Sequence, residues 1–311
     1  MLRVAILGRG PAAAAHAAAY ARLAGVDVTT TVDAAVAEIG TADIVDICVP
    51  VSDRADAIRR LVGQGRAILV VPPLAASLQD ADRWLKSVKR RHGRLFVTHT
   101  LRFHPVFARA KEMVSGGTMG AVRRIDLQRC WQPAAPEAAN DTDGILLSQD
   151  LDFCHWLLDG GATLPEVSGL TPARAACDTA ACRLTYPSAA VVDLSVRQDS
   201  GTGLGVLRQL TIECELGAVA CRVTSKSWLG DTPDQVEQCE VTRAGRARRV
   251  TVPDALPLLT ELGYRVGALA RGEPWLCPTL VEARAALALS EAIGGRREKG
   301  SGVSAQVSEG Q

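Results

Sequence analysis

Short apolar runs alternate with longer amphipathic stretches from position 3 to position 100. The apolar runs are rich in Val, Ile and Leu, and they predict buried strands at 3–8, 26–32, 42–50, 67–71 and 94–100. The stretches between them have helical periodicity and predict helices at 11–25, 33–40, 54–65 and 77–93. Such alternation predicts a doubly wound α/β domain, with a parallel sheet covered by helices on both faces.

The pattern changes after Leu101. Helices are predicted at 105–117 and 147–158, a strand at 121–130, and an irregular stretch at 132–144. From 167 to 252 several short strand-like runs are separated by Gly-rich turns, which predicts an open antiparallel sheet in an α+β domain. Two helices follow, at 255–273 and 279–295.

These patterns predict four parts of the chain. Residues 1–101 form a Rossmann-like domain, and residues 102–277 form an α+β domain for substrate binding and oligomerisation. Residues 278–295 form a helix that packs back near the first domain. The polar segment 296–311 is expected to be disordered.

Composition narrows the functional classes. The net charge of +1 gives no electrostatic reason to expect nucleic acid or an anionic membrane as a partner. Apolar residues make up 47% of the chain, but no run is long enough to cross a bilayer, and the first strand leaves no room for a signal peptide. The nine cysteines are scattered without a C-x-x-C pair. We therefore expect a cytoplasmic, reduced protein without a metal.

The motif GRGPAA follows the first strand and opens the first helix. This is the setting of a dinucleotide-binding G-x-G-x-x-G/A loop. Gly8 allows the tight turn, Gly10 lets the backbone approach a pyrophosphate, and Ala13 lets helix and strand pack closely. The N-terminus of the helix then faces the phosphates.

An acidic residue about 20 positions further on completes this fingerprint by binding the ribose hydroxyls. Asp33 follows the second predicted strand and has the right distance from the loop. Asp33 also opens a predicted helix, so a helix N-cap is the alternative interpretation. The first domain is short, because the chain up to Cys48 leaves room for one strand-helix unit fewer than a full mononucleotide-binding half.

An ordered set of motifs supports a family assignment. The motifs are VDICVP, PLAASLQDADRWL, THTLRFHPVFARAKEMVSGGTMGAVRRIDL and LSQDLDFCHWLL. With them the chain resembles the Gfo/Idh/MocA family (glucose-fructose oxidoreductase, inositol dehydrogenase and MocA) over nearly its whole length. The resemblance implies NAD or NADP as cofactor and a sugar, cyclitol or related small molecule as substrate. It also implies a homo-oligomer formed through the open face of the antiparallel sheet.

The chain departs from the family at two chemical positions. The E-K-P-L turn of relatives is Val71-Pro72-Pro73-Leu74 here, so Pro72, placed by position among the cofactor-binding residues, replaces the usual lysine. The usual L-S-H-E-I-D-Y reads LSQDLDF, which puts Gln149 at the position of the histidine. Neither proline nor glutamine can exchange a proton in hydride transfer. The second predicted strand matches either the second or the third strand of the family.

The remaining polar side chains near the expected cleft define the candidate site. Asp152 and His104 are the candidate acid-base residues. Arg102 is placed to hold a carboxylate or phosphate, with Gln149, Trp131 and the loop after it completing the substrate site. Three of these residues have a structural alternative. Arg102 ties the two domains together through a carboxylate, Asp152 caps or pairs, and His104 is a hydrogen-bonded structural histidine.

Three functions follow from these residues. The first is a divergent NAD(P)-dependent oxidoreductase with a non-standard proton donor, acting on a sugar, cyclitol or imine-like molecule. The second is a non-redox enzyme on the same fold, catalysing elimination, cyclisation or isomerisation. The third is an inactive binding or partner subunit.

Overall fold

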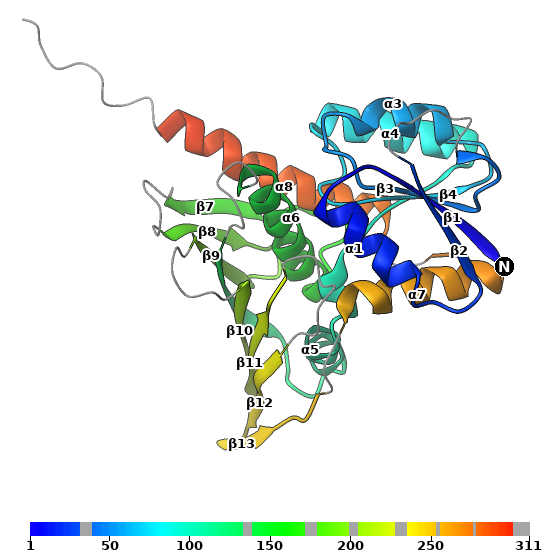
Figure 1. Cartoon of the computed structure of the whole chain (residues 1–311). Coiled ribbons are helices and arrows are strands. Elements are labelled where there is room, and N and C mark those ends of the chain that lie inside the picture. The colour runs from blue at the N-terminus through cyan, green and yellow to red at the C-terminus, as the bar shows by residue number, and fades with distance from the viewer. Residues whose placement is uncertain are drawn as a thin grey trace, which may run out of the picture.

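The buried strands near the N-terminus form one parallel sheet in the computed structural model, which describes residues 1–31, 39–132, 139–171, 179–198, 205–227, 235–252, 256–275 and 278–300. The first domain contains β1 (Leu2–Leu7), α1 (Pro11–Tyr20), β2 (Val26–Thr31), β3 (Ile44–Ile47), α3 (Arg54–Leu61), β4 (Ala67–Val70), α4 (Leu78–Arg91) and β5 (Arg94–Val97). The strand order is β2-β1-β3-β4-β5, and every neighbouring pair is parallel. The predicted doubly wound domain is confirmed (Figure 1).

The strand order shows which strand of a full Rossmann half is missing. β2 pairs with β1 along the whole length of both strands, from Leu2 opposite Val26 to Leu7 opposite Thr31. In the full 3-2-1-4-5-6 order the neighbour of the first strand on that side is the second strand, and the third lies outside it. Among the described residues β2 is the edge strand. Among the described residues, therefore, no strand lies at the outermost position of this sheet, and β2 lies at the ribose-side position.

The second domain is built on an eight-stranded sheet. Its elements are η1 (Thr100–Phe103), α5 (Pro105–Ser115), β6 (Val122–Trp131), α6 (Ala139–Leu157), β7 (Glu166–Thr171), β8 (Thr179–Thr185), β9 (Val191–Gln198), β10 (Val206–Cys214), β11 (Gly217–Ser225), β12 (Gln235–Arg243) and β13 (Arg246–Arg249). The order is β13-β12-β11-β10-β6-β9-β8-β7. All pairs are antiparallel except β6 and β9, which run parallel. The sheet is thus mostly, and not wholly, antiparallel.

Three boundaries differ from the sequence-based predictions. The fifth strand ends at Val97, and the chain turns into the short helix η1 instead of continuing to 100. Helix α6 begins at Ala139, inside the stretch expected to be irregular, because Ala, Asn and Asp there precede a long apolar helical run. Helix α8 extends to Gly300, so the start of the segment expected to be disordered is helical.

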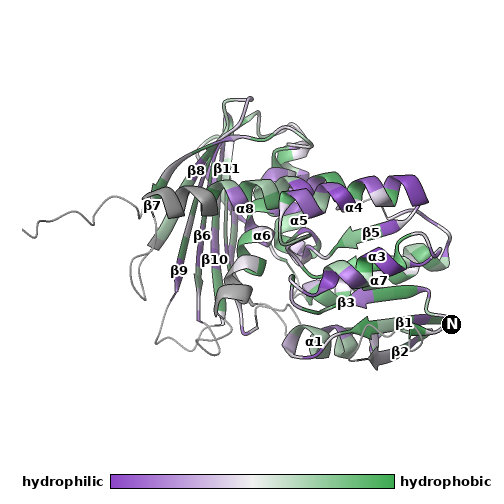
Figure 2. Ribbon diagram, turned by 90° about the horizontal axis from the view of Figure 1, so that it is seen from above, coloured by the Kyte–Doolittle hydropathy of each residue, from purple (hydrophilic) through white to green (hydrophobic). Residues whose placement is uncertain are grey.

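The last two helices cover both faces of the first sheet. Helix α7 (Pro257–Ala270) packs beside α1 and shares a core with β1, while α8 (Leu280–Gly300) contributes to the opposite core, with α3 and α4. Leu287 of α8 belongs to a core of the first domain, and Leu289 and Ile293 belong to the core of the second. Figures 1 and 2 both show α8 running from the first domain toward the second sheet. Helix α8 therefore contributes side chains to the cores of both domains.

Candidate cofactor and active site

The glycine loop between β1 and α1 has the geometry of a phosphate cradle. Gly8 and Gly10 have φ angles of 131° and 95°, which L side chains rarely adopt. A Cβ on Gly8 would lie 2.8 Å from the backbone carbon of Cys48, whereas a Cβ on Gly10 would meet nothing within 4 Å. Gly8 is therefore required by the fold, and Gly10 leaves open space above the loop.

Helix α1 starts directly at this open space. Pro11 occupies the first turn, and the amide of Ala14 makes an intrahelical hydrogen bond to the carbonyl of Gly10. The amides of Ala12 and Ala13 precede that bond and lie at the positive end of the helix dipole. Ala13 is buried in the core that α1 shares with β1. The residues present thus fit a dinucleotide pyrophosphate, while Asp33, the predicted ribose ligand, lies outside the described residues.

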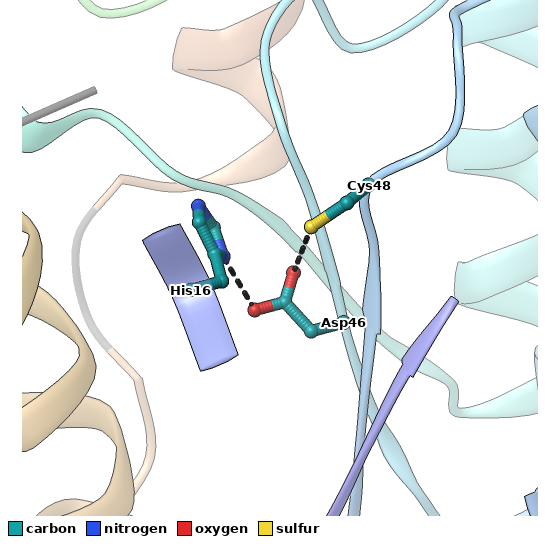
Figure 3. A group of neighbouring side chains, drawn as sticks. All are labelled: His16, Asp46 and Cys48. Atoms are coloured by element: carbon teal, nitrogen blue, oxygen red, sulfur yellow. Dashed lines mark hydrogen bonds and ion pairs between the residues drawn. The ribbon is translucent and has the colours of Figure 1, made fainter. Parts of the chain in front are cut away.

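A buried polar cluster lies beneath this loop (Figure 3). Nδ1 of His16 is 2.7 Å from Oδ2 of Asp46, the hydroxyl of Tyr20 donates to the same oxygen at 3.1 Å, and the thiol of Cys48 is 3.7 Å from Oδ1. Burial alone would lower the pKa of His16, but the Asp46 carboxylate raises that pKa well above its usual value. The histidine is therefore protonated and balances the charge of Asp46.

Sequence reasoning did not single out Asp46. The signal was a carboxylate inside an otherwise apolar strand, because a buried charge needs a partner. The ligand-type atoms of His16, Asp46 and Cys48 all lie within 4.8 Å of one another, a set that could hold a metal ion. The hydrogen-bonded ion pair already accounts for their packing and neutralises their charge. We interpret the cluster as the polar contact that fixes α1 on β3.

The Pro-Pro turn at the end of β4 is buried and contains a cis peptide bond between Pro72 and Pro73. Arg54, at the start of α3, donates to the carbonyl oxygens of Val71 and Pro73 and to that of Val49 at the end of β3. A single buried guanidinium therefore holds the two loops at the carboxyl ends of neighbouring strands, which is where ligands bind in open α/β sheets.

Arg102 and Asp152 form a bidentate ion pair between η1 and α6. Nε of Arg102 is 2.7 Å from Oδ2 and Nη2 is 2.6 Å from Oδ1 of Asp152, and Nη1 is 2.7 Å from Oε1 of Glu282 on α8. The arginine also stacks over the ring of Trp156, with its guanidinium carbon 5.4 Å from the ring centroid. This arrangement matches the alternative in which Arg102 ties elements of the molecule together through carboxylates.

The ion pair also affects the acidity of Asp152. Burial alone would raise the pKa of this carboxyl, but His99 and Arg102 hold the pKa below its usual value. Asp152 is thus a charged carboxylate at neutral pH, which suits a positioning group better than a proton donor. Its predicted role in proton transfer stays a prediction.

His104 is placed as a helix cap. It is fully buried at the N-terminus of α5, where Nδ1 accepts a hydrogen bond from the amide of Val106 at 3.2 Å and the ring packs on Phe107. This is the structural alternative considered for His104. Its predicted acid-base role is not tested by the geometry of the protein alone.

His99 follows β5. Its side chain lies closer to the candidate residue Asp152 than the sequence indicated. Its ring is buried, and Nδ1 is 3.6 Å from Oδ2 of Asp152, beyond hydrogen-bond distance. Neither ring nitrogen has a hydrogen-bond partner among the described residues. Burial, aided by the charges of Arg102 and Arg265, lowers the pKa of His99 to about 4. The imidazole is therefore neutral at pH 7.

Gln149 lies on α6, and Trp131 lies at the end of β6. Both are buried, and no hydrogen-bond partner of Trp131 Nε1 is found among the described residues. Next to Gln149, Asp150 lies 3.1 Å from Arg129 and 3.2 Å from Arg208 in a buried charge cluster that the sequence did not reveal. Of the loop predicted to follow Trp131, residues 133–138 lie outside the described residues, and residues 139–143 belong to α6.

Comparison with known proteins supports the resemblance. Residues 2–99 match the model of the family described as "Oxidoreductase family, NAD-binding Rossmann fold". The chain is 34% identical to the inositol 2-dehydrogenase of Rhizobium meliloti over 163 residues, a segment that covers 50% of this chain and 47% of that protein. The matched segment thus spans about half the length of the curated relative.

Solved structures extend the likeness to the whole fold. One is UDP-N-acetylglucosamine 3-dehydrogenase GnnA from Acidithiobacillus ferrooxidans, with a TM-score of 0.74, 21% identity, and coverage of 94% of this chain and 96% of that one. Another is an oxidoreductase from Agrobacterium radiobacter in complex with NAD+, L-tartaric acid and magnesium, with a TM-score of 0.78, 16% identity, and coverage of 96% and 97%. None of the described helices is long and apolar enough to cross a membrane. The first domain thus matches the model of an NAD-binding oxidoreductase family, and the two-domain fold of these solved structures extends over nearly the whole chain.

Proposed function

We propose that this protein is an NAD(P)-dependent oxidoreductase acting on a small polar molecule, with a proton donor other than the lysine and histidine of its relatives. The observation that carries the proposal is the cradle at Gly8, Gly10 and the N-terminus of α1, which matches a dinucleotide pyrophosphate in shape and in charge. When bound, the nicotinamide supplies or accepts the hydride. The chain's own residues must hold the substrate and manage the proton.

The placement of the polar residues narrows the chemistry. Pro72 and Gln149 have no useful pKa, Asp152 is a carboxylate held by Arg102, and His104 caps a helix. Loss of general acid-base help typically slows reduction of a ketone by about 10²–10⁴-fold. An imine-like substrate carries or attracts its own proton. Reduction of such a substrate therefore depends least on an acid-base residue of the protein. A sugar or cyclitol would require proton exchange with water.

The names of relatives support a polar substrate. The curated relative is an inositol 2-dehydrogenase and one structural neighbour is a UDP-N-acetylglucosamine 3-dehydrogenase. Homo-oligomerisation through the second sheet also remains a proposal. The outer face of that sheet has an exposed ion-pair network in which Asp193 binds Arg124 and Arg183, so a copy docking there would meet a polar surface.

Titration with NADH and with NADPH, followed by energy transfer from the tryptophans, tests the proposal. We expect saturable binding of at least one cofactor, lost in Gly10→Asp because a carboxylate then occupies the phosphate space. Gly245→Asp is the matched control, since Gly245 also has a positive φ of 73° and nothing within 4 Å of its Cβ position, but lies in the β12–β13 turn.

The two possible results separate the functional classes. Binding that survives Gly245→Asp but not Gly10→Asp supports hydride transfer and justifies a screen of imine and polyol substrates. If the wild-type protein binds neither cofactor, the oxidoreductase proposal fails, and the non-redox enzyme or the partner subunit becomes the better interpretation.

A further inference from the structure

Two cysteines lie in direct contact across the second sheet, far from the glycine loop. Cys221 of β11 and Cys239 of β12 are opposite each other in the antiparallel register, and their sulfur atoms are 3.5 Å apart. Both side chains are buried in the core of the second domain, and both thiols are free. The pair has no part in the proposed hydride transfer.

The backbone pattern places this pair at the closer type of antiparallel position. The carbonyl of Cys239 accepts a hydrogen bond of 2.7 Å from the amide of Val250, on the side of β13. Backbone groups of one strand residue point to the same side, so those of Cys239 point away from β11. Cys221 and Cys239 therefore form a non-hydrogen-bonded pair, with Cα atoms about 4.5 Å apart. This separation falls within the range of about 4.4–6.8 Å that disulfides span.

The surroundings distinguish the two thiols chemically. The thiol of Cys221 donates to the sulfur of Cys239. That hydrogen bond lowers the pKa of Cys239, with a further contribution from the guanidinium of Arg109, and the same contact raises the pKa of Cys221. The thiolate is the reactive form of cysteine. The hydrogen bond favours Cys239 as the first residue to react, with Cys221 in contact to follow.

We propose that Cys221 and Cys239 are a redox modification site, which a hydroperoxide converts to a cross-strand disulfide. In the first step the sulfur of Cys239 attacks the peroxide, the O–O bond breaks, and a sulfenic acid and an alcohol or water form. In the second step the sulfur of Cys221 attacks the sulfenic sulfur, the S–S bond forms, and water leaves. The two thiols lose two electrons and two protons, and the peroxide is reduced.

The place of the pair in the sheet gives the modification its effect. β12 pairs with β13, which is short and fully exposed, and this hairpin is the edge of the described sheet. Edge hairpins open locally at low free-energy cost, which gives a peroxide access to the buried pair. The disulfide would then fix β12 to β11 and raise the midpoint of thermal unfolding.

Peptide mapping of the full chain tests this assignment. The reduced protein is treated with hydrogen peroxide, unfolded in the presence of an alkylating reagent, and digested without reductant. We expect a linked peptide containing Cys221 and Cys239, two fewer alkylated cysteines, a higher unfolding midpoint, and complete reversal by dithiothreitol.

Single variants provide the controls. Cys221→Ser should abolish the linked peptide and leave Cys239 as a sulfenic acid or an over-oxidised product, whereas Cys130→Ser should leave the link intact. The proposal is overturned if wild-type protein gives both peptides alkylated after peroxide treatment, or links either cysteine mainly to another partner. The wild-type mapping decides this even if a serine variant folds poorly, and no result depends on nucleotide binding.

Discussion

Arg102 donates two hydrogen bonds to Asp152 across the junction of η1 and α6, and the side chains of both residues are 1% exposed. This contact joins two residues that the sequence placed in a substrate site. It also reaches α8 through Glu282, so one guanidinium holds three separate elements together. Buried charges of this kind are costly when one partner is removed.

Replacing this arginine should destabilise the protein strongly. Arg102→Ala leaves Asp152 buried without its cation, and we expect a loss of about 3–5 kcal/mol in the free energy of unfolding, measured by urea denaturation. Arg109→Ala is the matched control, because its pair with Glu112 is exposed and should change stability little. A small effect of Arg102→Ala would show that the contact is not maintained in solution.

The pair of His16 and Asp46 should make stability fall at alkaline pH. The folded-state pKa of His16 lies well above the ordinary 6.5, so its stabilising contribution is complete below pH 6.5 and is lost as the pH rises through the folded-state value. We expect the difference in unfolding free energy between wild type and His16→Gln to shrink over that window. A pH-independent difference would mean that the histidine is neutral in the folded protein.

His99 should act in the opposite direction at acid pH. Its folded-state pKa is about 4, so the unfolded chain takes up a proton that the folded chain excludes between pH 6.5 and pH 4. We expect a loss of stability on the order of 3 kcal/mol across this window, absent in His99→Phe. His92→Gln, at the exposed end of α4, serves as control and should keep the wild-type slope.

The two loop glycines should separate folding from nucleotide binding. Gly8→Ala strains a φ of 131° and places its Cβ 2.8 Å from the backbone of Cys48, so it should lower the unfolding free energy by about 1–3 kcal/mol. Gly10→Ala also strains a positive φ, of 95°, but its Cβ meets no protein atom within 4 Å, so it should destabilise the protein less than Gly8→Ala. It should weaken NADH binding by about tenfold or more. Denaturation and fluorescence titration of both variants measure the two effects.

Introducing the lysine and the histidine of the resembling family tests the proposal of a non-standard proton donor. If proton transfer is the missing element, Pro72→Lys combined with Gln149→His should raise oxidation of a polyol such as inositol by about 10²-fold or more over wild type. The single variant Gln128→His, on an exposed position of β6, controls for a new imidazole elsewhere. An unchanged rate in the double variant, with cofactor binding intact, would point to a substrate-binding difference instead.

The parallel sheet and the glycine loop were predictable because both rest on local rules. Apolar runs of strand length and a G-x-G turn determine their structure from neighbouring residues. The pairing of buried charges was not predictable in the same way. Arg102 and Asp152 are 50 positions apart in the sequence. Whether they bind each other or a ligand depends on how η1 packs on α6, and the sequence does not show this packing.

The same limit applies in the sheet of the second domain. Alternation indicates that Cys221 and Cys239 face inward, but the register that sets them opposite each other depends on the connection between β11 and β12. Asp46 is a different case. Its charge in a buried strand demanded a partner, which His16 of α1 provides.

The packing of α7 and α8 on the first sheet has a consequence for synthesis of the protein. Strands β1 to β5 are synthesised early. Leu262 and Leu287 belong to the two cores on the faces of that sheet, but they are synthesised only near the end of the chain. At ordinary elongation rates the delay is roughly 10–40 s. During this time the nascent domain exposes apolar surface that it later buries, so its folding is completed after translation and is a natural step for chaperone assistance.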